Sequence, residues 1–387
     1  MQPLRPQSTK DLAQTLEEAA ASKRSIVLRG AGSKDAMGGP VASADIDLRQ
    51  DRLSGVLKYE PRDLTVSVAA GTPWHELSAI LAAEGQMLAL DPPCAAVATV
   101  GGVVAANCSG PRRRLFGSAR DVVIGMSLAM LDGSVVQTGG MVVKNVAGLD
   151  MQKALIGSFG TLAVMASVNF RVSPLPEASR TFLIGCGTAE ECAAARDRIL
   201  TSVLQPAAAD ALNPAAAKLC GLDAYGLSEF VLAIAAGGSE RVLARYGREL
   251  TDAQILEGGR EQAFWNSVRE FAAEWVDRVP ERAVLRAGHP MSSLAEVLNS
   301  APGACVARAG NGVSYLALDN PSALREWMLA NATKGWTRVV EWSGSEVQGA
   351  LELWPAGDSA EFGVMERLKL LFDPQRLLNP GRLYGRL

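Results

Sequence analysis

Apolar residues at the start of the chain change from helical to β-type spacing. Leu12 and Leu16 recur at a helical interval and predict a helix over residues 9–22. Residues 25–29 and 64–69 are short β-branched and aliphatic runs, which are typical of strands. A helix, a strand and a glycine turn therefore follow one another, and this order is typical of a nucleotide site.

The same alternation continues as far as Pro174. A helix is predicted over residues 74–85 and a strand over residues 164–172. Residues 121–137 form two β-type runs joined by Asp132-Gly133, a pair that favours tight hairpin turns. This part of the sheet is therefore expected to be at least partly antiparallel.

Beyond Pro174, alanine-rich helical stretches alternate with short β-type runs. They predict one sheet with helices on one face, with strands that include residues 182–186, 230–236, 339–342 and 347–353. A helix over residues 363–373 and a turn at Pro380-Gly381 follow. The predicted organisation is a domain over residues 1–175, a cap over 176–355 and a segment over 356–387 that returns to the first domain.

Length and composition support two soluble domains. The 387 residues exceed one ordinary hydrophobic core, and 48% of them are hydrophobic. No apolar run approaches the ~20 residues of a membrane-spanning helix. Because the N-terminal segment also lacks the pattern of an export signal, a cytoplasmic protein is expected.

Cysteine spacing and net charge exclude other classes. The six cysteines contain no CxxC pair and do not cluster with the two histidines, which argues against zinc and iron–sulfur sites, so no metal is expected. A net charge of −3 gives no general attraction for nucleic acid. The triplet Arg112-Arg113-Arg114 is therefore interpreted as a solvated loop, a partner contact or charge near a cofactor.

Three glycine-rich segments, each beside a β-type run, carry the strongest chemical signal. They are residues 29–34 (RGAGSK), 99–117 (TVGGVVAANCSGPRRRLFG) and 157–161 (GSFGT). Glycine lets the backbone adopt positive φ and bring its N–H groups close to an anion. We therefore predict that main-chain amides from all three turns converge on one diphosphate of a nucleotide cofactor.

A nicotinamide site of the Rossmann type is improbable. Gly30-Ala31-Gly32 follows a predicted strand, but Asp35 occupies the position of the third glycine of that fingerprint. The chain then continues to Gly38-Gly39-Pro40 instead of entering a helix. NAD is therefore not expected as a tightly bound cofactor.

These segments resemble the FAD-linked oxidases of the p-cresol methylhydroxylase and vanillyl-alcohol oxidase type. RGAGSK, DPP (91–93), the 99–117 segment, residues 144–165 and FDPQRLLNPGRL (372–383) are most similar to the FAD-binding (E) subunits of bacterial glycolate oxidases, also called glycolate dehydrogenases. The resemblance implies an α+β fold with a two-subdomain FAD-binding domain and an α+β cap with a mainly antiparallel sheet.

The same resemblance implies a set of FAD contacts. The loop beneath the pyrophosphate would be Gly30, Ala31, Gly32, Ser33 and Lys34. The isoalloxazine ring would lie near Pro92 and Pro93, and the diphosphate and ribityl region would be lined by Thr99, Gly101, Gly102, Asn107, Ser109, Gly110 and Gly117. The adenine would meet backbone groups of Val123 and Val164, with close approach at Gly157 and Gly160, and the C-terminal tail would return through Asn379.

Departures from the family pattern are informative. Residues 30–34 contain no histidine or cysteine to attach a flavin, so FAD is expected to bind non-covalently. Related hydroxyacid dehydrogenases carry an HxGDGNxH segment, whereas residues 308–312 here read RAGNG and lack its histidines. Lys144 and Asp150 fit the family pattern, and we interpret both as scaffold residues.

Oxidation of a 2-hydroxy acid needs a base for the hydroxyl proton and a cation for the carboxylate. The chain has two histidines: His75 is interpreted as a surface or packing residue, and His289 is the better but weak candidate for the base. The catalytic residues are otherwise left unassigned.

The family resemblance implies a FAD-binding subunit of a glycolate oxidase complex. It would oxidise glycolate to glyoxylate and pass electrons to a second FAD-containing subunit and an iron–sulfur subunit, with possible membrane association through these partners. Two alternatives stay open. One is a self-sufficient FAD-dependent D-lactate-type 2-hydroxyacid dehydrogenase, and the other is a non-redox assembly scaffold, against which the intact glycine segments argue.

Overall fold

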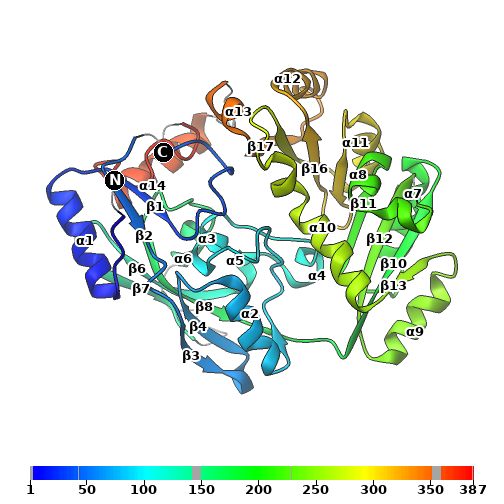
Figure 1. Cartoon of the computed structure of the whole chain (residues 1–387), viewed down its shortest axis with the longest axis horizontal. Helices are drawn as coiled ribbons and strands as arrows, with labels where there is room; N and C mark the ends of the chain where they lie inside the picture. The colour runs from blue at the N-terminus through cyan, green and yellow to red at the C-terminus, as the bar shows by residue number, and fades with distance from the viewer. Residues whose placement is uncertain (1–2, 42, 142–149, 228, 351–358, 386) are drawn as a thin grey trace. The chain divides into compact units, whose positions relative to one another are not determined.

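The computed structural model describes residues 3–41, 43–141, 150–227, 229–350, 359–385 and 387. The chain forms two compact units (Figure 1). The first unit consists of Met1–Ser109, Gly117–Leu175 and Glu352–Leu387, and the second of Gly110–Phe116 and Pro176–Leu351. Within the described part of the chain, no helix is both long and apolar enough to cross a membrane.

The first unit begins with the predicted helix and strand. Helix α1 starts after Ser8, whose Oγ accepts a hydrogen bond from the Asp11 amide at 3.0 Å. Leu12 and Leu16 are fully buried, as their helical spacing predicts. Strand β1 pairs in parallel with β2; the bounds are α1 Thr9–Ala21, β1 Ile26–Arg29 and β2 Ile46–Arg49.

A five-stranded antiparallel sheet forms the rest of the first unit's framework. Its strand order is β3-β4-β8-β6-β7. The bounds are β3 Val56–Glu60, β4 Thr65–Ala69, β6 Val123–Ala129, β7 Val135–Gly139 and β8 Val164–Arg171. The predicted hairpin joins β6 to β7, and Gly133 takes φ +77° in its turn. Asp132 Oδ1 accepts from the Ser134 amide at 2.9 Å, which stabilises that turn.

Short elements connect these strands and the tail. They are α2 Trp74–Ala83, β5 Gln86–Met87, α3 Val100–Ala105, α5 Ala119–Val122, α6 Gln152–Leu155, β9 Ser173–Pro174 and α14 Ser359–Phe372. Strand β5 pairs with β9. The helices predicted over 74–85 and 363–373 are thus present as α2 and α14.

The second unit is built on one eight-stranded antiparallel sheet. Its order is β13-β10-β12-β11-β15-β16-β14-β17. The bounds are β10 Ala178–Cys186, β11 Ala208–Leu212, β12 Phe230–Gly238, β13 Gln254–Leu256, β14 Ala283–Gly288, β15 Cys305–Arg308, β16 Val313–Leu318 and β17 Thr337–Ser343. The mixed α+β class expected from the resemblance is therefore confirmed, and so is the mainly antiparallel sheet.

Helices cover both faces of this sheet, so the expectation of helices on one face is wrong. Phe182 stacks on Tyr246 of α9, with ring centroids 5.7 Å apart. The neighbouring Thr181 accepts from Trp265 Nε1 of α10 at 2.6 Å. Because successive strand residues point to opposite faces, α9 and α10 lie on opposite sides. The helices are α4 Arg113–Phe116, α7 Ala189–Leu200, α8 Pro214–Leu219, α9 Glu240–Glu249, α10 Gly258–Val276, α11 Leu294–Ser300, α12 Pro321–Ala330 and α13 Ser345–Ala350.

The strand predicted over residues 347–353 is also wrong for the residues that the structure describes. Residues 347–350 belong to helix α13, which follows directly after Gly344. A β-carbon at Gly344 would lie 2.3 Å from the Pro280 carbonyl oxygen, so the two segments pack closely there. Residues 351–353 lie outside the described residues.

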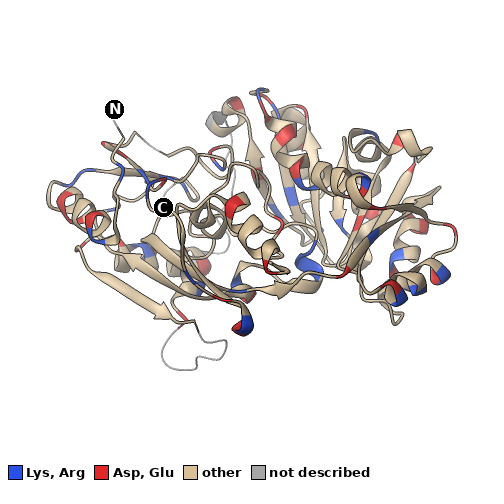
Figure 2. Ribbon diagram, turned by 60° about the horizontal axis from the view of Figure 1, so that its bottom comes forward, with Lys and Arg blue, Asp and Glu red and all other residues tan. Residues whose placement is uncertain are grey.

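Charged side chains are found on strands as well as on helices. Figure 2 shows blue and red bands on the strands of the eight-stranded sheet. Helices more commonly carry charges on their solvent faces, whereas strand positions inside a sheet are commonly apolar.

Candidate cofactor site

The loop that follows β1 presents a run of unused main-chain amides. The N–H groups of Gly30, Ala31, Gly32 and Ser33 donate to no acceptor among the described residues. Gly32 takes φ +77°, a conformation that glycine adopts without strain. Consecutive amides of this kind form a concave anion site, which fits a phosphate group. This is the strongest single feature for cofactor binding.

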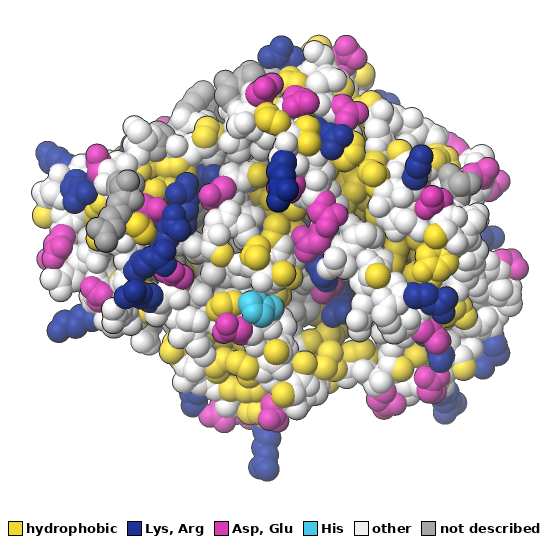
Figure 3. Space-filling view, in the orientation of Figure 1, with side chains coloured by type: hydrophobic (Ala, Val, Ile, Leu, Met, Phe, Trp, Pro, Cys, Tyr) yellow, Lys and Arg dark blue, Asp and Glu magenta, His cyan; other side chains and the backbone are white. Residues whose placement is uncertain are grey.

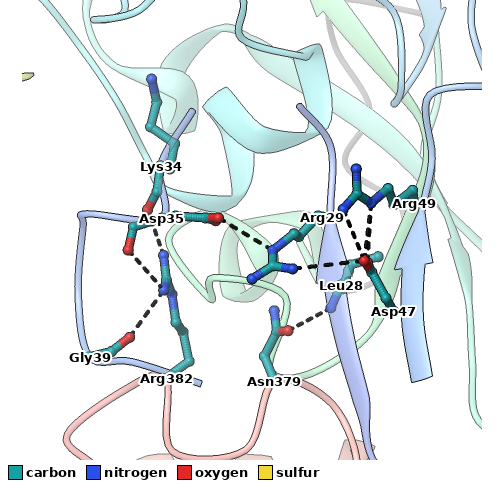
Figure 4. Close-up of polar contacts among 9 residues, drawn as sticks. All are labelled: Leu28, Arg29, Lys34, Asp35, Gly39, Asp47, Arg49, Asn379 and Arg382. Carbon is teal, nitrogen blue, oxygen red and sulfur yellow. Dashed lines mark hydrogen bonds and ion pairs between the residues drawn. The ribbon is translucent and has the colours of Figure 1, made fainter. Parts of the chain in front are cut away.

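Arg382 of the C-terminal segment holds this loop from below (Figure 4). Its guanidinium donates to the carbonyls of Lys34 at 2.6 Å, Gly39 at 3.0 Å and Asp35 at 3.4 Å. These bonds fix the backbone directly after the amide run, at residues 34–39. Burial lowers the pKa of the Arg382 guanidinium, and the Asp35 carboxylate acts in the opposite direction.

The other predicted ring-side and diphosphate residues lie next to this loop. The Lys34 ammonium donates to the Pro93 carbonyl at 2.5 Å. A β-carbon on Gly30 would lie 2.1 Å from Thr99 Oγ1, so only glycine fits there. The structure therefore brings the first loop, the Pro92-Pro93 turn and Thr99 together.

The second and third glycine segments use most of their amides inside the protein. Gly101 donates to the Ala70 carbonyl at 2.7 Å, and Gly102 to Thr99 Oγ1 at 3.3 Å. Gly157 and Phe159 donate to carbonyls of α3 at 3.2 and 2.9 Å. Amides without an acceptor among the described residues remain in the first turn and, in the later segments, at Ser109, Gly110 and Gly160. The convergence of all three turns on one diphosphate therefore stays a prediction. The later glycines also allow close packing between segments.

Three side-chain polar atoms in these two segments are available to a ligand. Asn107 Oδ1, Ser109 Oγ and Ser158 Oγ are buried and have no hydrogen-bond partner among the residues that the structure describes. Asn107 also has φ +49°, and its Cβ lies 3.4 Å from the position of a β-carbon on Gly157. Buried polar atoms are nearly always paired in folded proteins, so this group fits a polar ligand. Strained backbone beside them is typical of functional sites.

Asn379 connects the C-terminal tail to strand β1 and to the third glycine segment. Its Oδ1 accepts from the Leu28 amide and its Nδ2 donates to the Phe159 carbonyl, both at 2.7 Å. A β-carbon on Gly160 would lie 2.9 Å from Asn379 Nδ2. Because both ends of the amide are bonded to backbone, Asn379 positions the loops, and its contact with the flavin stays a prediction.

We expect Asn379→Ala to destabilise the protein. The substitution leaves the Leu28 N–H and the Phe159 carbonyl unpaired at a cost of about 1–3 kcal/mol each. Urea unfolding should report this loss, while Asn299→Ala, which removes an exposed bond to Glu190, should change the unfolding free energy by less than about 0.5 kcal/mol. Equal effects of the two substitutions would contradict the positioning role.

A buried ion pair anchors the same tail. The Lys369 ammonium of α14 donates to Asp373 Oδ2 at 2.7 Å, to the Thr161 carbonyl at 2.7 Å and to the Leu378 carbonyl at 3.0 Å. Asp373 accepts in turn from the Leu377 and Leu378 amides. Burial lowers the pKa of Lys369, and Asp373 opposes that shift. The sequence analysis did not predict this ion pair. The lysine within the apolar LKLLFD run could have indicated it, because a lysine among apolar residues needs a buried partner.

Charges on β1 and β2 flank the first loop (Figure 4). Arg29 Nε lies 3.3 Å from Asp35 Oδ2, and its Nη1 lies 3.8 Å from Asp47 Oδ2. Arg49 also pairs with Asp47, at 3.0 Å. Arg29 is therefore held beside the amide run, where its positive charge favours an anionic group.

Val123 and Val164 cannot both contact one adenine. They are the first residues of β6 and β8, and Val123 pairs with Phe170 whereas Val164 pairs with Ala129. Six residues of β8 separate the two positions, which is about 20 Å along a strand. The family resemblance implied that both contact the adenine, but the antiparallel register puts them at opposite ends of the paired strands.

Gly117 and Gly110, two further residues predicted to line the cofactor site, lie beside α5 and in the second unit, respectively. Gly117 has φ +83°, and a β-carbon there would lie 2.7 Å from Asp121 Cβ, beside the start of α5. Gly110 belongs to the second unit, in the segment Gly110–Phe116, where Arg114 Nη1 donates to the Pro206 carbonyl at 2.9 Å.

Neither histidine is arranged as a free base. His289 Nδ1 contacts the Pro290 carbonyl at 2.9 Å and Nε2 contacts Ser314 Oγ at 2.8 Å, while burial lowers its pKa. These contacts fit a neutral structural histidine. His75 is exposed on α2. Figure 3 shows the cyan of histidine at one place on the face that it draws. Asp150 forms an ion pair with Lys153 at 2.8 Å, and Lys144 lies outside the described residues.

Two family descriptions match the chain. "FAD binding domain" matches residues 3–139, and "FAD linked oxidases, C-terminal domain" matches residues 356–383. In structure the chain is similar to alkyldihydroxyacetonephosphate synthase, with a TM-score of 0.76 at 17% identity over 97% of this chain and 75% of that one. It is also similar to p-cresol methylhydroxylase, with a TM-score of 0.74 at 12% identity over 99% and 88%. These neighbours confirm the fold.

One relative is similar over its full length. The glycolate oxidase subunit GlcE of Escherichia coli (strain K12) is 30% identical over 384 residues, which cover 97% of each chain. The glycolate oxidase subunit GlcD of Bacillus subtilis (strain 168) is 26% identical over 54% of this chain and 44% of its own. The chain therefore belongs to the family of FAD-linked oxidases that includes the GlcE subunit. It is a FAD-dependent oxidoreductase, and the amide run, the glycine packing and the unpaired polar atoms fit that cofactor.

Proposed function

We propose that this protein oxidises the hydroxyl group of a small 2-hydroxy acid, glycolate in the first instance, to the 2-oxo acid glyoxylate. The similarity to a glycolate oxidase subunit over 97% of both chains is the observation that carries this proposal. Bound FAD supplies the acceptor for two electrons.

This chain's own residues would bind and orient the cofactor. The amides of residues 30–33 would hold the diphosphate, with Arg29 beside them. Asn107, Ser109 and Ser158 would bond to polar groups farther along the flavin. No histidine or cysteine lies in residues 30–34, so we propose that FAD binds there without a covalent bond.

We further propose that the protein works as one subunit of a complex. The full-length relative is itself named as a subunit, and a second relative with part of this sequence is another subunit of the same enzyme. Electrons would then leave through a second FAD-containing subunit and an iron–sulfur subunit. The complex would lie in the cytoplasm, with any membrane contact made by the partners.

A self-sufficient dehydrogenase is the second candidate. D-lactate dehydrogenase [cytochrome] 1 of Saccharomyces cerevisiae is 28% identical over 43% of this chain, and the Arabidopsis thaliana enzyme is 29% identical over 49%. These relatives match about half of the chain, whereas GlcE matches nearly all of it. The similarity to GlcE therefore favours the complex.

The test is anaerobic flavin reduction by the purified full-length chain, alone and with the other two subunits. We expect the chain to bind FAD, to release it on acid precipitation, and to have its flavin reduced by glycolate when the partners are present. Reduction of the isolated chain by D-lactate or glycolate would favour the second candidate. A folded chain that refuses added FAD would reject both.

A further inference from the structure

A line of charged and aromatic side chains crosses five neighbouring strands of the second unit's sheet. In the order β11, β15, β16, β14 and β17, each strand contributes one residue to what we name the polar stripe: Asp210, Arg308, Tyr315, Arg286 and Glu341. Arg308 forms an ion pair with Asp210, and Arg286 Nε lies 2.6 Å from Glu341 Oε2. Tyr315 lies directly opposite Arg286 in the sheet.

The other side of the same strands is mostly apolar. Leu285, Ala287 and Leu316 alternate with the stripe residues and are fully buried. A sheet face inside a domain usually carries side chains of that kind. Ion pairs in such a place cost desolvation energy that their attraction does not reliably offset, so stability alone is a weak reason for the polar stripe.

The stripe is also unbalanced in charge. It holds two guanidinium groups and two carboxyl groups, and Arg113 of α4 adds a third positive charge. Burial raises the pKa of Glu341, and Arg286, Arg308 and Arg113 oppose that shift in decreasing order. Burial likewise raises the pKa of Tyr315 to about 12, so its hydroxyl stays protonated at neutral pH. The site therefore has an excess of positive charge and of donors.

Several of these donors have no acceptor within the part of the chain that the structure describes. The ion pair with Glu341 uses Arg286 Nε, and its Nη1 and Nη2 make no hydrogen bond to a described residue. The Tyr315 hydroxyl and the Arg113 guanidinium also have no such partner. The side chain of Arg286 is 36% exposed and that of Glu341 is 16% exposed, so a small solute can reach them.

We propose that the polar stripe is a binding site for the carboxylate of a small hydroxy acid. Arg286 offers two parallel N–H groups to the carboxylate, a geometry that a guanidinium provides and an ammonium does not. Tyr315 donates a further hydrogen bond, Arg113 adds charge, and Glu341 accepts from the ligand's hydroxyl group. The choice of a hydroxy acid rests on the proposed function, whereas the carboxylate site rests on the donors themselves.

Calorimetric titration of the FAD-loaded full-length chain with oxalate tests this proposal without turnover. We expect Arg286→Gln to weaken oxalate binding at least tenfold and Tyr315→Phe to weaken it about three-fold. Arg286→Lys keeps the charge and should weaken binding to an intermediate degree. Arg245→Gln, which removes an exposed ion pair with Glu249 on α9, is the matched control and should bind oxalate like the unmodified protein.

Glu341→Gln separates a ligand site from a structural ion pair. In a carboxylate site, removal of the competing negative charge should leave oxalate binding unchanged or several-fold tighter. If Arg286→Gln folds and binds oxalate normally, or if Glu341→Gln abolishes binding in a folded protein, the proposal is overturned. Reduction of the flavin by glycolate is measured in parallel. If the variants change oxalate binding as expected but glycolate does not reduce the flavin, only the proposed function is rejected. If glycolate reduces the flavin but the variants do not change oxalate binding as expected, only the carboxylate site at the polar stripe is rejected.

Discussion

Replacement of Gly30 by alanine is expected to remove tight FAD binding. The new β-carbon would lie 2.1 Å from Thr99 Oγ1, far inside van der Waals contact. Either the loop or Thr99 must move, at a cost of about 1–3 kcal/mol or more, and the run of amides at residues 30–33 loses its arrangement. A change of ~1.4 kcal/mol is tenfold in affinity, so FAD binding should weaken at least tenfold in a fluorescence titration.

A double substitution makes this prediction specific. Thr99→Ala removes the Oγ1 atom, after which the nearest Thr99 atom to the new β-carbon is Cβ at 3.1 Å. Gly30→Ala with Thr99→Ala should therefore bind FAD more tightly than Gly30→Ala alone, because the two effects are coupled. Gly247→Ala on α9 meets no atom within 4 Å and serves as the control. Simple additivity would show that the steric argument is wrong.

Loss of the Lys369 ammonium is expected to give the largest change in stability. Lys369→Ala leaves Asp373 as a buried, uncompensated charge, since their side chains are 1% and 0% exposed. Removal of one partner from a buried pair costs about 3–5 kcal/mol. It also removes the donors that hold the Thr161 and Leu378 carbonyls, so FAD affinity should fall together with the unfolding free energy.

A nearby ion pair provides the comparison for that experiment. Arg376 and Glu366 lie 3.5 Å apart with side chains about two-fifths exposed. Arg376→Gln should therefore change the urea unfolding free energy by less than about 1 kcal/mol, because exposed ion pairs contribute little. If Lys369→Met, which fills the same space without charge, is as stable as the unmodified protein, the anchor role of the ion pair is incorrect.

The local spacing of apolar and turn residues was sufficient to predict several helices and strands of the first unit. Helix α1, the β6–β7 hairpin and α14 appear where spacing and turn residues predict them, since neighbours in sequence determine each of these elements. The glycine-rich turn directly after β1 was also predictable from sequence, because glycine beside a strand end favours a turn. The strand expected at residue 347 failed because an apolar run alone does not separate a strand from a buried helix.

Other features depend on strand order, which local sequence does not contain. Val123 and Val164 both begin strands, and only the antiparallel register places them at opposite ends of β6 and β8. The polar stripe draws one residue from each of five strands between positions 210 and 341, so its members are separated by long stretches of sequence. Gly101 and Gly157 were expected to face a ligand, but contacts between distant segments occupy their amides.

The anchoring of the first unit by Arg382, Asn379 and Lys369 has a consequence for biosynthesis. These residues follow Pro176–Leu351 in the sequence, so a ribosome must complete the whole second unit before the flavin loops can be fixed. At about 5–20 residues per second, those residues take roughly 10–35 s to translate. We therefore expect the N-terminal part of the first unit to lack these anchors during that interval, and flavin uptake to follow chain synthesis.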